Sequence, residues 1–179
     1  MDPLIAVIAF IPAMIANSLA VIFGGGTPID FGREWKDKRL LGDGKTWRGL
    51  FGGGISAGLL GFMIKYLNSS NFTIYPSYPE GIVVIFSLSF GALFGDIAAS
   101  FIKRRKGITR GKRSPLMDKY DFIVGAFLLV IIVNPDWFNE IYLKGNGWIG
   151  TLIIIIGVPF LHRAVNIIGY KLGLKEEPW

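Results

Sequence analysis

Charged residues in this chain gather in short segments that separate long apolar runs. Of the 179 residues, 51% are hydrophobic even without the 24 glycines, whereas a soluble domain reaches about 45–50% only with glycine included. A helix of about 20 apolar residues crosses the hydrocarbon core of a bilayer. We therefore predict an all-α polytopic membrane protein that forms a single domain over residues 1–179, with five transmembrane helices at residues 4–23, 50–67, 81–102, 115–133 and 148–169.

Two of these runs require a choice between alternatives. A cleavable signal peptide needs a positively charged start, and only three residues, none of them basic, precede the first run, so we expect a retained span. The fourth apolar run, residues 122–133, has only 12 residues. Ser114 and Pro115 are typical of an N-cap and a first helical position. A helix that begins at Pro115 has about 19 residues and a length of roughly 28 Å.

Loops rich in lysine and arginine alternate strictly along the chain with loops that have one or none. Residues 24–49 carry six, residues 103–120 carry eight and the tail from residue 163 carries three, whereas residues 68–80 carry none and residues 134–147 carry one. Cations near the ends of transmembrane helices mark the cytoplasmic side. We therefore expect a multi-pass protein of the cell membrane with two basic cytoplasmic loops, an N-terminus outside and a C-terminus in the cytoplasm.

The same cations limit the classes of partner. The net charge is +6, which in a membrane protein reflects cytoplasmic loops and anionic headgroups, so we expect membrane lipids and no nucleic acid as partners. The chain has no cysteine, which excludes disulfides, thiolate metal sites and a cysteine nucleophile. The sequence leaves open whether the chain forms a homodimer.

The strongest functional signal lies at the end of the third span. Asp96, Ser100 and Lys103 are spaced i, i+4 and i+7, so they share one face of a helix. An ionisable residue in a transmembrane segment is costly and indicates function. The alternative is that Lys103 and Arg104 merely neutralise Asp96.

Two further acids follow at the start of the fourth span. Asp118 and Asp121 are three residues apart and lie on one helix face, although they could instead only complement the positive end of the helix dipole. With Asp96 they offer three carboxylates, and Mg²⁺ takes oxygen ligands that it shares with substrate phosphates. We predict all three as metal ligands that also act in catalysis, with Lys103 and Arg104 stabilising phosphate charge.

The nucleophile and the nucleotide follow from what surrounds these acids. No histidine lies near them to act as a base. A phosphate monoester needs none, because its second pKa near 6 leaves it largely dianionic at neutral pH. The pattern favours a lipid phosphate as the nucleophile and a nucleotide that enters from the cytoplasm, and it does not identify the base.

The segment GDGKT, residues 42–46, is similar to the end of a Walker A loop. The full motif needs a glycine six positions before the lysine, and Arg39 stands there, so we reject a P-loop. Lys45, Thr46 and Arg48 remain candidates for phosphate contacts beside exposed backbone N–H groups, with Ser100 as a further candidate. The alternative is an ordinary basic cytoplasmic loop.

Other residues have less certain meaning. Asn17 in the first span either makes an interhelical hydrogen bond or faces a substrate cavity, and His162 is expected to be an interfacial group rather than a ligand. The sequence assigns no role to Asp30. Three glycines of the second span fall at helical spacing and predict a close approach of a neighbouring helix: Gly54, Gly58 and Gly61.

At its acids and basic residues the chain resembles the CDP-diglyceride synthetase family of membrane cytidylyltransferases. The shared frame is Gly95-Asp96, Ser100, Lys103-Arg104, Asp118 and Asp121. The bacterial and eukaryotic pattern has a Lys-Asp step after Lys-Arg, a His-Gly-Gly element before the paired aspartates and an arginine after the first of them. Here Gly111 and SPLM (residues 114–117) stand instead, and Lys119 replaces the arginine.

These departures, together with GDGKTWRG (residues 42–49), IKRRKG (102–107) and SPLMDKYDF (114–122), are similar to the archaeal branch, the CDP-archaeol synthases. The resemblance extends over nearly the whole chain. It implies that CTP reacts with unsaturated archaetidic acid, an ether-lipid phosphate with isoprenoid chains, to give CDP-archaeol and pyrophosphate with Mg²⁺ in phospholipid biosynthesis. It assigns metal or nucleotide roles to Asp96, Asp118, Asp121, Lys103 and Arg104, and phosphate or cytosine contacts to Lys45 and Thr46.

Other classes remain as alternatives. A CDP-alcohol phosphatidyltransferase needs the motif D-G-x-x-A-R, and Asp118 is followed by Lys-Tyr-Asp instead. A CTP-dependent lipid or polyprenol kinase would transfer the γ-phosphate to an alcohol and would need a group to accept the hydroxyl proton. A small membrane transporter should carry its charges near the midplane of several spans. A non-catalytic binder of anionic lipids would keep the cations without needing three acids.

Overall fold

The computed structural model describes residues 2–68, 74–108, 114 and 117–174, except for the side chain of His162. Within these residues the chain forms seven helices and no β-strand, with two isolated bridges in the loop before α3. This confirms the predicted all-α class. The helices are α1 (Pro3–Ala9), α2 (Ile11–Ile22), α3 (Trp47–Leu67), α4 (Glu80–Arg105), α5 (Met117–Val133), α6 (Pro135–Tyr142) and α7 (Gly147–Lys171).

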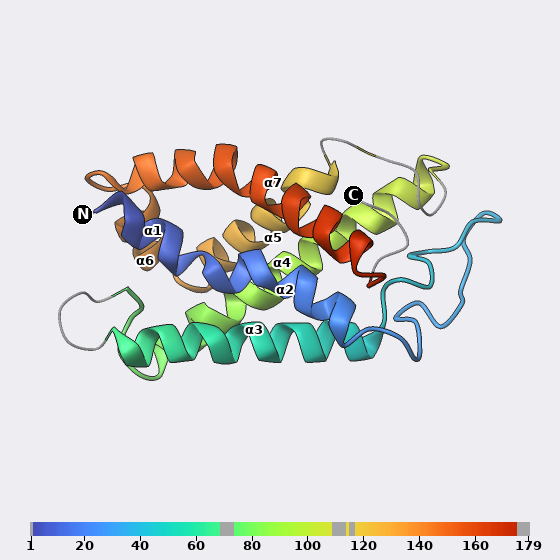
Figure 1. The fold of residues 1–179 in the computed structure, drawn as a ribbon, viewed down its shortest axis with the longest axis horizontal. Helices are drawn as coiled ribbons and strands as arrows, with labels where there is room; N and C mark the ends of the chain where they lie inside the picture. Colours follow the sequence, from blue (N-terminus) through green and yellow to red (C-terminus); the bar gives the residue numbers. More distant parts are fainter. Residues whose placement is uncertain (1, 69–73, 109–113, 115–116, 175–179) are drawn as a thin grey trace.

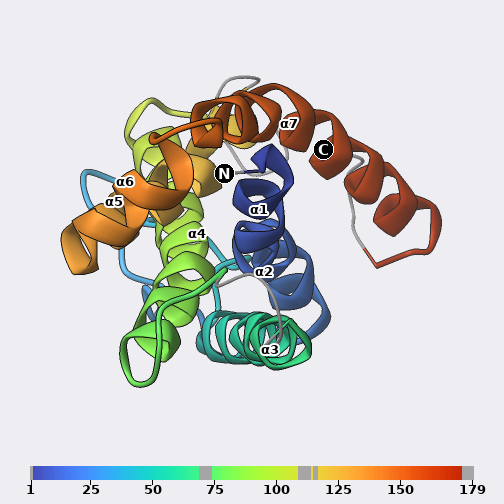
Figure 2. The same cartoon turned by 90° about the vertical axis from the view of Figure 1, so that its left-hand side faces the viewer.

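The long helices run side by side along the long axis of the molecule (Figure 1). In the end-on view, α2 lies among α3, α4 and α7 (Figure 2). The most extensive pairing is that of α4 with α5. The loop of residues 24–46 and the C-terminal ends of α4 and α7 lie at the same end of the long axis, which we call the basic end; the N-terminus and α6 lie at the opposite end (Figure 1).

The first predicted span is divided at Phe10. The sequence predicts one continuous helix over residues 4–23, whereas the structure has α1 and α2 on either side of Phe10. Pro12 explains the break, because proline lacks an N–H group and its ring clashes with the carbonyl four residues earlier. Together the two helices still form an apolar stretch of 20 residues, Pro3–Ile22, that is long enough to cross a bilayer.

Four stretches of the described chain are long and apolar enough to span a membrane: Pro3–Ile22, Trp47–Leu67, Glu80–Arg105 and Gly147–Lys171. They match four of the five predicted spans. The remaining span, predicted over residues 115–133, corresponds to α5, which has 17 residues and a length of about 26 Å. Residues 115 and 116 lie outside the described part, so the fifth span stays a prediction.

One helix replaces a predicted loop. The sequence predicts a loop over residues 134–147, and the structure places α6 there. Asn134 begins it, because its side-chain oxygen accepts the Trp137 N–H at 3.0 Å. The Trp137 Nε1–H donates to the Ile74 carbonyl at 3.1 Å, so α6 packs on the chain that enters α4. A hydropathy pattern does not reveal α6, because it is short and mixes polar with aromatic residues.

Glycines on α3 allow its neighbours to approach, as the sequence predicts. A Cβ atom at Gly54 would lie 2.5 Å from the Phe90 ring, and one at Gly61 would lie 2.6 Å from Cγ of Pro12. Gly58 likewise leaves room for an aromatic ring of α4. Side chains at these positions would push α2 and α4 away from α3, so the packing role is confirmed.

The contact between α4 and α5 is closer still, because backbone meets backbone. A Cβ atom at Gly125 would lie 2.6 Å from Cα of Gly95, and one at Gly95 would lie 2.9 Å from the carbonyl carbon of Asp121. Asp96 follows Gly95 directly in the chain. The crossing therefore brings Asp96 of α4 beside the first turns of α5.

We predict that Gly125→Ala lowers the free energy of unfolding by about 1–3 kcal/mol, the usual cost of overpacking a tight core. Thermal unfolding in detergent measures the change. Gly157→Ala on α7 is the matched control, because its nearest neighbour beyond the local backbone is Cγ2 of Ile153 at 3.9 Å and alanine favours a helix over glycine. Equal melting temperatures for the two variants would contradict the close crossing.

Candidate active site

The loop before α3 carries a lysine onto the acid of α4. The Lys45 Nζ atom forms an ion pair with Asp96 Oδ2, although the two residues lie 51 positions apart in sequence. Both side chains are only partly exposed, at 25% and 23%. Lys45 directly precedes Thr46, the N-cap of α3. The start of α3 therefore fixes where this ammonium group lies.

A second ion pair joins the end of α4 to the start of α5. The Lys103 Nζ atom lies 2.8 Å from Asp118 Oδ1. Asp118 Oδ2 accepts the Ser114 N–H at 2.7 Å, and the Asp118 N–H donates to the Ser114 carbonyl at 2.9 Å. The predicted first helical residue, Pro115, lies outside the described residues, so the helix start that the sequence indicates at Ser114 and Pro115 stays a prediction.

Asp121 lies about one turn further along α5, near residues of both pairs. Its Oδ1 accepts the Phe122 N–H at 2.7 Å. The charges of Asp96, Lys103 and Lys45 all act on its carboxylate. Five of the predicted site residues, taken from the loop, α4 and α5, are thus brought into one electrostatic cluster: Lys45, Asp96, Lys103, Asp118 and Asp121.

This cluster has the carboxylate oxygens that a metal site needs, but its acids are not grouped closely enough to form one by themselves. Among the described residues, no three acids or histidines lie close enough together to hold an ion, and Asp96 and Asp118 are each paired with a lysine. Mg²⁺ commonly takes one or two carboxylates and completes its shell with substrate phosphates and water. The neighbouring acids Asp96 and Asp121 suit that mode, and metal binding by these residues stays a prediction.

The other predicted phosphate contacts have different surroundings. The Thr46 Oγ1 atom accepts the Gly49 N–H at 3.1 Å and is buried, so this side chain caps α3. Ser100 is buried within α4, whereas Arg48 is exposed beside the start of α3. Arg104 donates from Nε to the Leu41 carbonyl at 3.3 Å and from Nη1 to the Ile108 carbonyl.

Two ambiguous residues stay undecided. The Asn17 Oδ1 atom is buried and has no hydrogen-bond partner in the part of the chain that the structure describes. The structure therefore shows no interhelical hydrogen bond to this oxygen among the described residues, and the position facing a substrate cavity stays a prediction. His162 belongs to α7, but its side chain lies outside what the structure describes.

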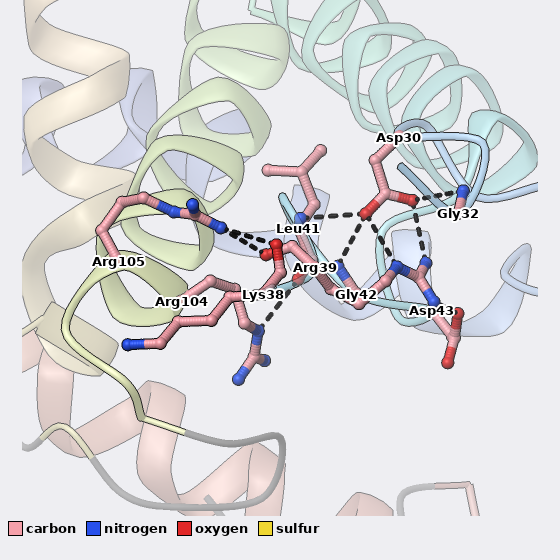
Figure 3. A network of polar contacts seen from close by, with 9 residues as sticks. All are labelled: Asp30, Gly32, Lys38, Arg39, Leu41, Gly42, Asp43, Arg104 and Arg105. Carbon is pink, nitrogen blue, oxygen red and sulfur yellow. Dashed lines mark hydrogen bonds and ion pairs between the residues drawn. The ribbon is translucent and has the colours of Figure 1, made fainter. Parts of the chain in front are cut away.

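Asp30, to which the sequence assigns no role, is the centre of a polar network in the loop (Figure 3). Its carboxylate accepts N–H groups from Leu41 at 2.9 Å, Gly42 at 3.1 Å and Gly32 at 3.1 Å, and it pairs with Arg39 Nη2 at 2.9 Å. Burial alone would raise the pKa of Asp30, but Arg39 and these N–H donors outweigh it and hold the pKa well below its ordinary value. The carboxylate thus stays charged and ties distant parts of the loop together.

Arg105 attaches the same loop to α4 (Figure 3). Its Nη2 donates to the carbonyls of Lys38 at 2.9 Å and Arg39 at 2.8 Å, and its Nη1 donates to the carbonyl of Trp35. Sequence reasoning missed this role, because bonds to backbone carbonyls leave no motif. The glycines Gly32 and Gly42, which adopt positive φ, indicate turns in the loop but do not identify Arg105 as the residue that binds it.

An apolar groove of 580 Å³ lies between α4 and α5. Ala98 contributes from α4, and Val124, Leu128 and Ile132 contribute from α5, while Asp121 is the one charged residue among its lining residues. Val124, Leu128 and Ile132 are exposed, at 53%, 55% and 76%. The groove therefore connects the exposed apolar surface of α4 and α5 with the charged cluster.

We predict that Asp30→Asn destabilises the protein most at neutral pH. Because the pKa of Asp30 is lower in the folded chain than the ordinary value of about 3.9, its charge stabilises the fold above about pH 4, and this contribution falls as the pH drops further. Melting temperatures in detergent between pH 3 and pH 8 should show the gap between wild type and variant narrowing at low pH. A gap that is constant with pH would contradict this account.

The matched control for that measurement is Asp43→Asn. Asp43 also pairs with Arg39, at 2.7 Å, but its side chain is 61% exposed. An exposed ion pair is worth roughly 0–1 kcal/mol, so this variant should melt close to wild type. A large loss at Asp43 would show that the Arg39 charge, rather than the buried Asp30 carboxylate, stabilises the loop.

Comparison with known proteins places the chain in a family. The family model described as CarS-like, CDP-archaeol synthase, matches residues 1–179. The CDP-archaeol synthase of Methanosarcina barkeri is 44% identical over 178 residues, which cover 94% of this chain and 99% of the relative. Those of Methanoculleus marisnigri and Picrophilus torridus are 47% identical over 171 residues and 42% identical over 180 residues, and the alignments cover 94% and 98% of this chain and 99% and 96% of the relatives.

The fold also matches a solved structure, described as an intramembrane enzyme for archaeal membrane lipids biosynthesis. The TM-score is 0.69 at 36% sequence identity, and the match covers 93% of this chain and 95% of the other. Sequence and fold agree over nearly the whole length. The chain belongs to the CDP-archaeol synthase family.

Proposed function

We propose that the chain is an integral membrane enzyme that transfers CMP from CTP to an archaeal ether-lipid phosphate. The products are CDP-archaeol and pyrophosphate. Membership of the CDP-archaeol synthase family supports the reaction. The structural observation that carries it is the groove between α4 and α5, which leads from an apolar helix surface to Asp121 and the paired lysines.

The groove suits the lipid substrate. Val124, Leu128 and Ile132 recur every four residues along α5, so they form one apolar stripe. An isoprenoid chain in the bilayer could lie along this stripe with its phosphate at the charged end, near Lys103. The lipid would then meet the nucleotide without leaving the membrane.

The transfer itself needs one displacement at phosphorus. An oxygen of the lipid phosphate forms a bond to the α-phosphorus of CTP, the bond between that phosphorus and the bridging oxygen breaks, and pyrophosphate leaves with the electron pair. The lipid phosphate is largely dianionic at neutral pH, so no base has to remove a proton. Lys45 and Lys103 supply positive charge where the phosphates would meet.

Asp96, Asp118 and Asp121 are the residues that we propose for Mg²⁺. A bound Mg²⁺ would neutralise phosphate charge and hold the reacting groups in line. Lys45 pairs with Asp96, and Lys103 pairs with Asp118. The two acids thus position the two lysines, which could contact the same phosphates as the metal ion. Arg104 contacts backbone carbonyls, so we assign it to holding the loop rather than to catalysis.

We further propose five spans with the basic end in the cytoplasm. The loop of residues 24–46 and the end of α4 lie at the same end of the molecule (Figure 1), as the alternation of cations requires. α5 runs beside α4 along the bundle, and a start at Ser114 would lengthen it toward a full span. In this orientation, CTP reaches the charged cluster directly from the cytoplasm.

The main experiment follows labelled CTP with purified protein, Mg²⁺ and an ether-lipid phosphate in detergent. We predict that label in the cytosine moves into lipid while pyrophosphate is released. Asp96→Asn, Asp118→Asn and Asp121→Asn should each lower turnover by at least about 100-fold, the usual effect of removing a group that positions charge in a transition state. Asp136→Asn is the control, because this exposed acid lies on α6 at the opposite end.

Three results would contradict the proposal in different ways. Transfer of label from the γ-phosphate alone would indicate a lipid kinase. If a folded protein transferred neither label, the result would favour a transporter or a lipid binder. Near wild-type turnover of any one Asp→Asn variant with Mg²⁺ would remove that residue from the set of ligands.

The groove makes a separate prediction. Val124→Trp should fill it and raise KM for the lipid by about tenfold or more, since the apolar contacts of one large side chain are worth roughly 1.5–3 kcal/mol. KM for CTP should stay unchanged. Ile131→Trp is the matched control, because Ile131 is also exposed on α5 but does not line the groove. Equal effects of the two variants would place the lipid elsewhere.

A further inference from the structure

The loop of residues 24–46 is closed at its two ends by backbone pairing. The Ile29 N–H donates to the Lys45 carbonyl at 2.8 Å, and the Trp47 N–H donates to the Thr27 carbonyl at 3.2 Å. Asp30 follows this pairing directly. The position of Lys45 therefore depends on how the closed loop sits on α4.

The Asp30 carboxylate fixes the shape of the loop from inside. It is bound by backbone N–H groups from both arms, Gly32 on one side and Leu41 and Gly42 on the other. The Asp30 side chain is 1% exposed, so the carboxylate is not available to a ligand in solution. An asparagine would keep the size of this group but would weaken every one of its charge-assisted bonds.

Arg105 fixes the loop from outside. Its guanidinium group donates to three loop carbonyls and lies over the rings of Trp35 and Phe101, at 5.3 Å and 5.4 Å from their centroids. Its Nε atom is buried and has no hydrogen-bond partner among the described residues. Arg105 thus directs its donors at the loop rather than toward a phosphate in solution.

These contacts attach both members of the Lys45–Asp96 pair to α4: Asp96 belongs to this helix, and the loop that carries Lys45 is bound by Arg105 at its end. Asp96 and Arg105 are nine residues apart on α4, which is about 14 Å along a helix. The guanidinium group holds the far side of the loop, and Asp30 transmits that position to the paired segment that contains Lys45.

We propose that Asp30 and Arg105 are positioning residues that hold Lys45 beside Asp96 for the triphosphate of the nucleotide. The role rests on the proposed cytidylyl transfer, because it assigns Lys45 to that substrate. Neither residue touches the reacting atoms. Each acts through Lys45, which separates this role from a direct contact with phosphate and from simple stabilisation of the fold.

A double-mutant cycle tests the proposal through its dependence on Lys45. Arg105→Ala should lower kcat/KM for CTP at least tenfold, and adding it to Lys45→Ala should cost less than a further threefold, because effects that share one route are not additive. Arg105→Lys should also lose activity, since an ammonium group does not reproduce the forked donors of arginine. Lys106→Ala is the matched control, because this neighbouring cation is exposed. For variants with no detectable turnover, the same double-mutant cycle is measured with the affinity for CTP, determined by calorimetry.

A distance measurement tests the positioning without any turnover. The chain lacks cysteine, so Lys36→Cys on the loop and Glu80→Cys at the far end of α4 give one clean pair of spin labels. Arg105→Ala should broaden or shift the distance distribution at a melting temperature within a few degrees of wild type, Asp30→Asn should do so at a temperature well below its own, lower melting temperature, and Lys106→Ala should not. Unchanged distances would overturn the proposal. So would a loss of kcat/KM in the Arg105→Ala, Lys45→Ala double variant that equals the product of the two single losses. Changed distances in a protein that does not transfer CMP would keep the positioning role and reject the proposed function.

Discussion

The ion pair between Lys45 and Asp96 joins the two kinds of structure in this protein. Asp96 belongs to an apolar helix, and a carboxylate in such a place is costly unless a partner compensates it. Lys45 belongs to a polar loop that forms no strand and has no regular helix of its own. The pair therefore requires that the loop adopt one conformation against α4, and the bonds of Asp30 and Arg105 supply that conformation.

The glycine crossing of α4 and α5 shapes both the charged cluster and the apolar groove. Gly95 and Gly125 let the two backbones touch, which brings Asp96 and Asp121 near each other from different helices. The same two glycines line the apolar groove, which follows the seam where the two helices meet. One packing device thus forms the charged cluster and the surface that leads to it.

Sequence reasoning recovered the features that local pattern determines. The all-α class and the packing glycines of α3 follow from hydropathy and from helical spacing, which also group Asp96 with Lys103 and Asp118 with Asp121, whereas Lys45 was indicated only by the segment GDGKT and by the family resemblance. It failed at short local features and where tertiary contacts decide. The break at Phe10 needed the local effect of Pro12 to be weighed against a continuous apolar run, and α6 was too short and too polar to detect. The roles of Asp30 and Arg105 were not predictable, because a bond to a backbone carbonyl depends on a loop conformation that no motif specifies.

The basic run at the end of α4 shows why counting cations is not enough to assign them. Lys103 pairs with Asp118, whereas Arg104 and Arg105 bind loop carbonyls. The order suits the chemistry, because a compact ammonium group matches a single carboxylate oxygen and a planar guanidinium group can bridge several carbonyls. These residues also add to the positive charge of the basic end, so one sequence feature serves orientation, charge pairing and loop attachment together. Because α4 carries Asp96 and the attachment points of the loop, while Lys45 directly precedes the N-cap of α3, the geometry of the Lys45–Asp96 pair depends on how the loop and the start of α3 sit on α4.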